Sequence, residues 1–167
     1  MPALIILGVS GSGKTTVARA LAHHYGYAFL DADDFHSEES KAQMASGVPL
    51  TDAQREPWVA ALAHALQTNE KEGRSSVLAF SGLRAAHRQA LRDSGVPMRF
   101  AFLHAEQAQV AARLTDRTGH FMPADLLASQ YEALQLPTDE PDVISVDVEG
   151  TPEQVLRRVI AQSRTSA

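Results

Sequence analysis

A glycine-rich stretch, GVSGSGKTT at residues 8–16, is the feature that most constrains how this chain can fold. It follows directly on the apolar run LIIL, and its residues have the spacing Gly8-x-x-x-x-Gly13-Lys14-Thr15. A loop of this kind, between a strand and a helix, wraps backbone N–H groups around a polyphosphate, which side chains with a Cβ would obstruct. The sequence therefore predicts a nucleotide-binding P-loop.

Each part of this loop has a predicted task. Lys14 reaches the β- and γ-phosphates as a point charge, the Thr15 hydroxyl can ligate Mg²⁺, and the following helix turns its positive N-terminus toward the anion. The residues predicted to hold the nucleotide in this loop are Gly8, Ser10, Gly11, Ser12, Gly13, Lys14, Thr15 and Thr16.

Short apolar runs alternate with helical patterns along the whole chain, as in a parallel sheet covered by helices. Strands are predicted at 3–7, 28–31, 76–80, 99–103 and 143–146, and helices at 14–24, 52–68, 84–93, 106–116, 123–134 and 152–163. Thr51 or Asp52 should cap the second helix, and Thr151 the last. These patterns predict one α/β domain over residues 1–167, a three-layer sandwich whose ligands bind beyond the strand C-termini.

Charge and composition argue for a small-molecule partner. The chain has 15 Lys and Arg against 20 Asp and Glu, a net charge of −5, so no basic surface predicts binding to nucleic acid or an anionic membrane. There is no cysteine, and no apolar run approaches the roughly 20 residues of a membrane span. We expect a cytoplasmic protein.

Two carboxylates follow the second predicted strand, in DADDFH at 31–36. On extended chain Asp31 and Asp33 would point to the same side, toward the mouth of the P-loop. One could hold a water of the Mg²⁺ shell, and the other could accept the proton of an attacking hydroxyl. The alternative is an acidic turn that caps the next helix.

Arginines follow the next two strands. Arg84 and Arg88 come four apart after the third strand, beside Ser81 and Gly82, which can offer backbone or hydroxyl contacts. Arg113 and Arg117 are also four apart and precede GHFMP at 119–123, where a glycine and a proline predict a hinged lid. Arginines that close over a triphosphate would neutralise the charge that develops in transfer. The alternative is that they are solvated surface residues.

The chain resembles the bacterial gluconate kinases, small P-loop kinases related in fold to shikimate and nucleoside-monophosphate kinases. The resemblance rests on blocks that run in the family's order over nearly the whole chain: GVSGSGKTT, DADDFH, KAQMASGVPLTDAQREPW, SGLRAAHRQALR and RTGHFMPADLLASQYEALQLP. The P-loop alone is unspecific, because it occurs in proteins of many functions. The blocks MASGVPLTDAQREPW and GHFMPADLLASQ are much more specific.

The resemblance implies ATP-dependent phosphorylation of the terminal hydroxyl of D-gluconate, with Mg²⁺, by a homodimer. It implies an acceptor-binding segment at about 34–68 and a lid at about 113–130. It implies that phosphoryl transfer is carried out by Lys14, Asp33 and Arg117, with Asp33 as the base. It also implies that Mg²⁺ is bound by Thr15 and, through water, by Asp31. Arg113 and Arg117 would also contact ATP, and the acceptor residues would be Asp33, His36, Arg55, Ser81, Gly82, Arg88 and His120. Arginine suits that pocket because its planar fork matches a carboxylate.

Two departures from the family pattern bear on the acceptor. Where the family has asparagine and lysine after the acidic pair, this chain has Ser40 and Gln43. A related aldonate, a keto-gluconate or shikimate therefore remains an alternative acceptor. Trp58, the sole tryptophan, is expected to pack in the core rather than to stack on a ligand.

Two other classes of protein fit the sequence less well. A nucleotide-dependent switch would show Asn-Lys-x-Asp after a late strand, and no such sequence is present. A nucleic-acid kinase or remodelling ATPase would carry a basic stripe.

Overall fold

The computed structural model describes residues 2–9, 12–104, 128, 130–132, 134–137 and 139–165. Five parallel strands form one sheet in the order β2-β3-β1-β4-β5. The strands are β1 (Ala3–Leu7), β2 (Ala28–Asp31), β3 (Ser76–Phe80), β4 (Met98–His104) and β5 (Val143–Asp147). All five match the predicted strands to within one residue at either end, and the parallel α/β sandwich is confirmed.

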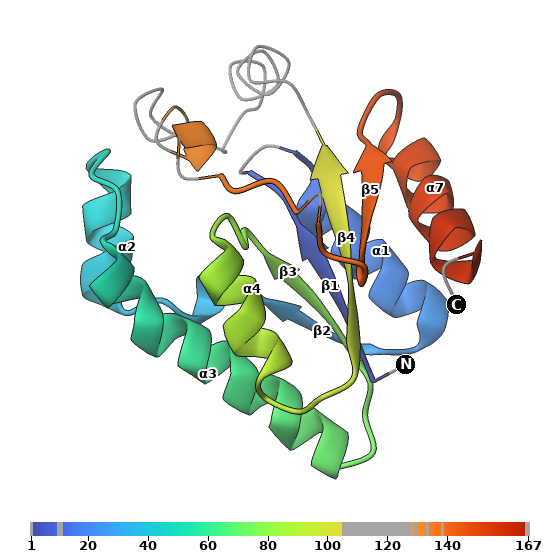
Figure 1. Cartoon of the computed structure of the whole chain (residues 1–167), viewed down its shortest axis with the longest axis horizontal. Coiled ribbons are helices and arrows are strands. Elements are labelled where there is room, and N and C mark those ends of the chain that lie inside the picture. The colour runs from blue at the N-terminus through green and yellow to red at the C-terminus, as the bar shows by residue number, and fades with distance from the viewer. Residues whose placement is uncertain are drawn as a thin grey trace.

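Helices cover both faces of the sheet, which makes the three layers seen in Figure 1. Helices α1 (Lys14–Tyr25) and α7 (Pro152–Thr165) pack on one face, and α3 (Asp52–Lys71) and α4 (Ala85–Arg92) pack on the other. Side chains of β1 point alternately to the two faces of the sheet, and so the core has two halves. Leu4 and Ile6 pack with α1 and α7, whereas α3 and α4 pack against Ala3, Ile5 and Leu7. A 3₁₀ turn η1 (Ala32–Phe35) and a short helix α2 (Glu38–Ala45) connect β2 to α3.

The predicted caps are present. The Thr51 hydroxyl accepts from Gln54 N at 3.2 Å while the Gln54 side chain accepts from Thr51 N at 2.9 Å, a reciprocal capping box at the start of α3. Thr151 and Gln154 make the same pair of bonds at the start of α7. Both helices therefore begin where the sequence predicts.

Helix α2 was not predicted, and two predicted helices cannot be compared. Helix α2 begins at Ser37, whose side chain accepts from Ser40 N at 3.1 Å. The predicted helix at 106–116 lies outside the described residues, as does most of the one at 123–134. No helix in the described part of the chain is both long and apolar enough to span a bilayer.

Candidate active site

The phosphate loop leaves the C-terminal end of the central strand and leads into α1. Gly8 N donates to Ser81 O of the neighbouring loop at 3.4 Å, and the buried Ser12 hydroxyl donates to Val9 O at 2.7 Å. Gly13, the N-cap of α1, has a φ of 91°, a conformation that favours glycine. No side chain caps α1, so the N–H groups of its first turn are available to an anion.

Lys14 and Thr15 open α1 and face the end of β2. The Thr15 hydroxyl lies 3.5 Å from Asp31 Oδ2. Burial lowers the pKa of Lys14, and the negative charges of Asp33 and Asp31 counter that effect. The Thr15 hydroxyl and the Asp31 carboxylate are oxygen groups of the kind that Mg²⁺ takes as ligands, directly or through water.

Asp31 lies on extended chain as predicted, but Asp33 lies in the 3₁₀ turn η1, contrary to the prediction. Asp31 ends β2 and accepts from Asp33 N at 3.0 Å through its own side chain, so the backbone turns at once into η1. The Asp31 carboxylate accepts the backbone N–H of Asp33, which in a continued strand would donate to a neighbouring strand, and so the chain turns here. Burial raises the pKa of Asp31, the hydrogen bond from Asp33 N lowers it, and the charges of Asp33 and Asp34 raise it further. Asp33 itself is exposed.

His36 follows η1 and lies against Trp58 of α3. Their rings stack, with centroids 4.1 Å apart and planes at 20°. Burial lowers the pKa of His36, Asp33 raises it, and Lys41 and Arg55 lower it. The imidazole is therefore biased toward its neutral form, in which one ring nitrogen can donate and the other accept. Trp58 packs in the core, as predicted, and also provides this stack, which was not expected.

Two arginines share one carboxylate near the start of α3. Arg55 Nη1 lies 3.4 Å from Asp52 Oδ1, and Arg84 Nε lies 3.9 Å from the same oxygen. The Arg84 Nε is buried without a hydrogen-bond partner. Burial lowers the pKa of Arg55, Asp52 raises it, and Arg84 lowers it. The two guanidinium groups that share Asp52 are candidates to contact the carboxylate of a ligand.

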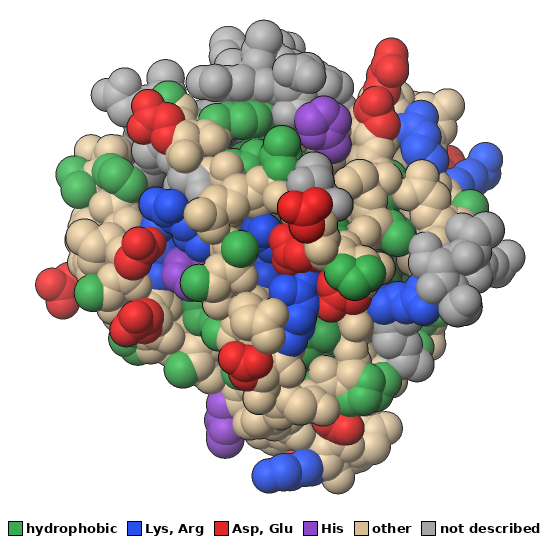
Figure 2. Space-filling model, viewed as in Figure 1, with side chains coloured by type: hydrophobic (Ala, Val, Ile, Leu, Met, Phe, Trp, Pro, Cys, Tyr) green, Lys and Arg blue, Asp and Glu red, His purple; other side chains and the backbone are tan. Residues whose placement is uncertain are grey.

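This charged cluster lies at a groove between α3 and α4. The groove has a volume of about 760 Å³, and Asp52, Glu56, Arg84 and His87 are among its lining residues. On the face shown in Figure 2, basic side chains and a histidine lie recessed among acidic ones. Burial lowers the pKa of His87, and the charges of Arg55 and Arg84 are among the further causes. Sequence reasoning missed Arg84 and His87 as members of this cluster.

The loop after β3 is shaped by Gly82. Its φ is 55°, and a Cβ there would lie 2.4 Å from Leu7 Cδ2. Glycine is therefore required for the loop to pass over the end of β1. Ser81 is partly buried, and its carbonyl accepts from Gly8 N, so this loop and the phosphate loop are bound to each other.

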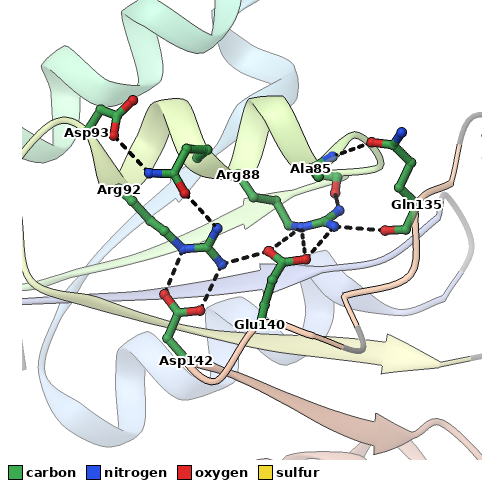
Figure 3. A network of polar contacts seen from close by, with 9 residues as sticks. Ala85, Arg88, Arg92, Asp93, Gln135, Glu140 and Asp142 are labelled. Carbon is green, nitrogen blue, oxygen red and sulfur yellow. Dashed lines mark hydrogen bonds and ion pairs between the residues drawn. The ribbon is translucent and has the colours of Figure 1, made fainter.

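Arg88, which was predicted to contact the acceptor, is bound by other protein groups in this structure. Its side chain is 1% exposed, and Figure 3 shows its guanidinium surrounded by protein groups. Nε donates to Glu140 at 2.9 Å, Nη1 to Gly82 O at 2.6 Å, and Nη2 to Gln135 O at 2.8 Å and to Glu140 at 2.6 Å. The hydrogen bond from Arg88 lowers the pKa of Glu140, although burial opposes it. Since every nitrogen of the guanidinium is engaged, Arg88 holds α4 and two loops together.

The two unusual residues of α2 have internal partners. Gln43 and Gln54 exchange amide hydrogen bonds of 3.2 and 2.8 Å, and Gln43 Nε2 also donates to Pro49 O at 3.0 Å. Ser40 is buried in the first turn of α2. Gln43 therefore joins α2 to the start of α3.

Some predicted site residues cannot be compared with the structure. Ser10, Gly11, Arg113, Arg117 and His120 lie outside the described residues.

The fold and the site define a class of protein, a P-loop kinase. The AAA domain family matches residues 4–141, and the chain belongs to it. Within that class the chain belongs to the gluconokinase family. It is 41% identical to a gluconokinase of Gluconobacter oxydans over 157 residues, which are 94% of this chain and 88% of that one. It is 38% identical to the thermoresistant gluconokinase of Escherichia coli, covering 95% of this chain and 89% of that one.

A solved structure agrees with this membership. The crystal structure of a gluconokinase from Sinorhizobium meliloti superposes with a TM-score of 0.89 at 37% identity, covering 98% of this chain and 93% of the other. The predicted family resemblance is confirmed, and the family binds ATP through its P-loop.

Proposed function

We propose that this protein transfers the γ-phosphoryl group of ATP to the terminal hydroxyl of D-gluconate, giving 6-phospho-D-gluconate and ADP. The observation that carries the proposal is the position of Asp33. This exposed residue follows Asp31, whose carboxylate lies 3.5 Å from the Thr15 hydroxyl of the phosphate loop, by two positions, and its carbonyl accepts from His36 N of the acceptor segment at 3.4 Å. The gluconokinases to which the chain is similar support the choice of acceptor.

The nucleotide side of the site fits a triphosphate with Mg²⁺. The uncapped first turn of α1 would hold the phosphates with backbone N–H groups, and Lys14 would contact the β- and γ-phosphates. Thr15 and, through water, Asp31 would hold Mg²⁺, which when bound neutralises charge on the phosphates. The 3.5 Å between the Thr15 hydroxyl and the Asp31 carboxylate fits this assignment.

The transfer step needs a base and little other covalent chemistry. The terminal hydroxyl oxygen of gluconate forms a bond to the γ-phosphorus as the bond from that phosphorus to the β,γ-bridging oxygen breaks. The hydroxyl proton goes to the Asp33 carboxylate, and the bond electrons leave with ADP. Lys14 stabilises the negative charge on the phosphoryl oxygens. Arg117 and Arg113, on the predicted lid at 113–130, would add positive charge.

The acceptor carboxylate is bound by Arg55 and Arg84 in this proposal. The pair shares Asp52, and the Arg84 Nε that lacks a hydrogen bond would gain one from the ligand. A neutral sugar would offer the two arginines no carboxylate and should bind less well than a sugar acid. His36, Ser81 and Gly82 would also contact the acceptor, and His120 would join them.

The experiment is an assay of ADP release with gluconate, other aldonates, 2-keto-gluconate, shikimate, glucose and nucleoside monophosphates. We expect the highest kcat/KM with gluconate, and a KM for gluconate raised about tenfold or more in Arg84→Gln. The matched control is Arg99→Gln in β4. Alternation with Ala101 and Leu103 places Arg99 on the face of the sheet that α1 and α7 cover, away from the cluster, so this variant should leave that KM unchanged. Highest activity with glucose or a nucleoside monophosphate would overturn the proposal, and highest activity with another sugar acid would change only the acceptor.

We also propose that the chain forms a homodimer and works in the cytoplasm, with residues 1–167 as one kinase domain and the acceptor-binding segment at about 34–68. The family resemblance supports the dimer, and the use of ATP suits the compartment. Sedimentation at micromolar concentration would test the dimer.

A further inference from the structure

The ring of Trp58 contacts three parts of the candidate active site. Its Nε1–H donates to Ala32 O at 2.7 Å, which joins α3 to η1. The same ring stacks on His36 and packs edge-on against Phe80, with centroids 5.2 Å apart and planes at 63°. Phe80 ends β3 and directly precedes Ser81. One buried side chain thus connects the turn that carries Asp33, the imidazole and the loop after β3.

The bond to Ala32 fixes the turn from outside. Within the turn, Asp33 N donates to the Asp31 carboxylate at 3.0 Å and His36 N donates to Asp33 O at 3.4 Å. These bonds close the turn on itself, while the Thr15–Asp31 contact and the packing of Ala32 and Phe35 in the core hold it against the helices. The bond from Trp58 is buried, as is Ala32, so it keeps most of its strength. The indole N–H is therefore the directional contact from α3 to the turn, beside the apolar packing of Ala32 and Phe35.

The stack restricts His36 in the same way. His36 is 9% exposed, and its ring lies nearly parallel to the indole. A flat contact over a rigid, buried ring leaves the imidazole few orientations. The stack on Trp58 therefore limits how the imidazole can turn.

We propose that Trp58 is a positioning residue for phosphoryl transfer, holding Asp33 through Ala32 and His36 through ring stacking. The inference rests on the proposed function, because it takes Asp33 as the base. Displacing a catalytic group by about 1 Å can cost about a hundredfold in rate, so loss of the indole N–H should lower kcat more than it weakens binding.

The chain allows an unusually specific test, because Trp58 is its sole tryptophan. Protein grown with a tryptophan analogue that has sulfur in place of the indole N–H is altered at this one side chain, with its shape and stacking kept. Trp58→Phe is the second variant, which keeps an aromatic ring and also lacks the donor. The matched control is Leu66→Ala, which removes a buried side chain eight residues further along α3 and lowers stability while keeping Trp58 and its bond to Ala32.

We expect kcat with gluconate to fall about tenfold or more in the analogue protein and in Trp58→Phe, with the KM for ATP within about twofold of the unaltered protein. Leu66→Ala should keep its kcat below its melting temperature. An unaltered kcat in the analogue protein would overturn the inference. A fall in kcat that Leu66→Ala shares would also overturn it, because the effect would then follow stability.

The two proposals fail differently. If the unaltered protein does not phosphorylate gluconate, the proposed acceptor is wrong, and the same comparison is made with the sugar acid that it does phosphorylate. If it phosphorylates no sugar acid, both proposals fail. If it phosphorylates gluconate and the analogue protein does so equally fast, only the role of Trp58 is wrong.

Discussion

Replacing Arg88 by methionine should destabilise the protein strongly. The side chain is 1% exposed and donates to two backbone carbonyls, Gly82 O and Gln135 O, as well as to Glu140. Methionine would leave both carbonyls without this donor, at about 1–3 kcal/mol each, whereas Glu140 would keep its contact with Arg92. We expect a loss of about 3–5 kcal/mol, which in a chain of this size lowers the melting temperature by roughly 6–20 °C.

Thermal unfolding followed by circular dichroism, with and without saturating gluconate, measures this effect. Arg92→Met is the control, since Arg92 is 19% exposed, and it should cost only about 1–2 kcal/mol. Because the pKa of Glu140 is lowered in the folded protein, the contribution of that carboxylate is present above the ordinary pKa of glutamate and is lost as the pH falls through the folded value. An unchanged melting temperature together with a large rise in the KM for gluconate would refute the reasoning and return Arg88 to the acceptor pocket.

Three other predictions concern the site. Asp33→Asn should lower kcat by about 10²- to 10⁴-fold with little change in ATP affinity, and a loss of ATP affinity alone would make Asp33 a metal-shell residue. Arg117→Ala should lower kcat more than it weakens gluconate binding, and an unchanged kcat would indicate a solvated arginine. The fluorescence of Trp58 should fall as His36 gains a proton, at a pH below the usual value of about 6.5 because burial lowers the pKa of His36. That step should vanish in His36→Gln, and a step at or above pH 6.5 would contradict the burial argument.

The strands and the long helices could be predicted because their signals are local. Each strand is a short apolar run, and the caps at Thr51 and Thr151 lie within three residues of their partners. Helix α2 has no such signal, since Ser40 is its one buried residue and no apolar stripe repeats along it. It depends on the cap at Ser37 and on the amide pair that joins Gln43 to Gln54.

The site was predicted less completely, because its contacts join distant residues. Arg84 and Arg88 were expected on one helical face, but Arg84 is the N-cap of α4, with an extended backbone. The guanidinium of Arg88 donates to Glu140, which lies 52 positions further along the chain. A contact over that separation cannot be read from the local sequence pattern. The stack of Trp58 on His36 also joins two segments far apart in sequence.

The order of the strands has a consequence for synthesis of the chain. Of the five strands of this sheet, β1 is synthesised before the others and is the central one, and its two neighbours are β3 at Ser76–Phe80 and β4 at Met98–His104. At about 5–20 residues per second, roughly 4–14 seconds separate the synthesis of Leu7 from that of Ser76. Throughout that interval the nascent chain carries a fully apolar segment with no edge to pair with, and this is when it most needs protection from aggregation.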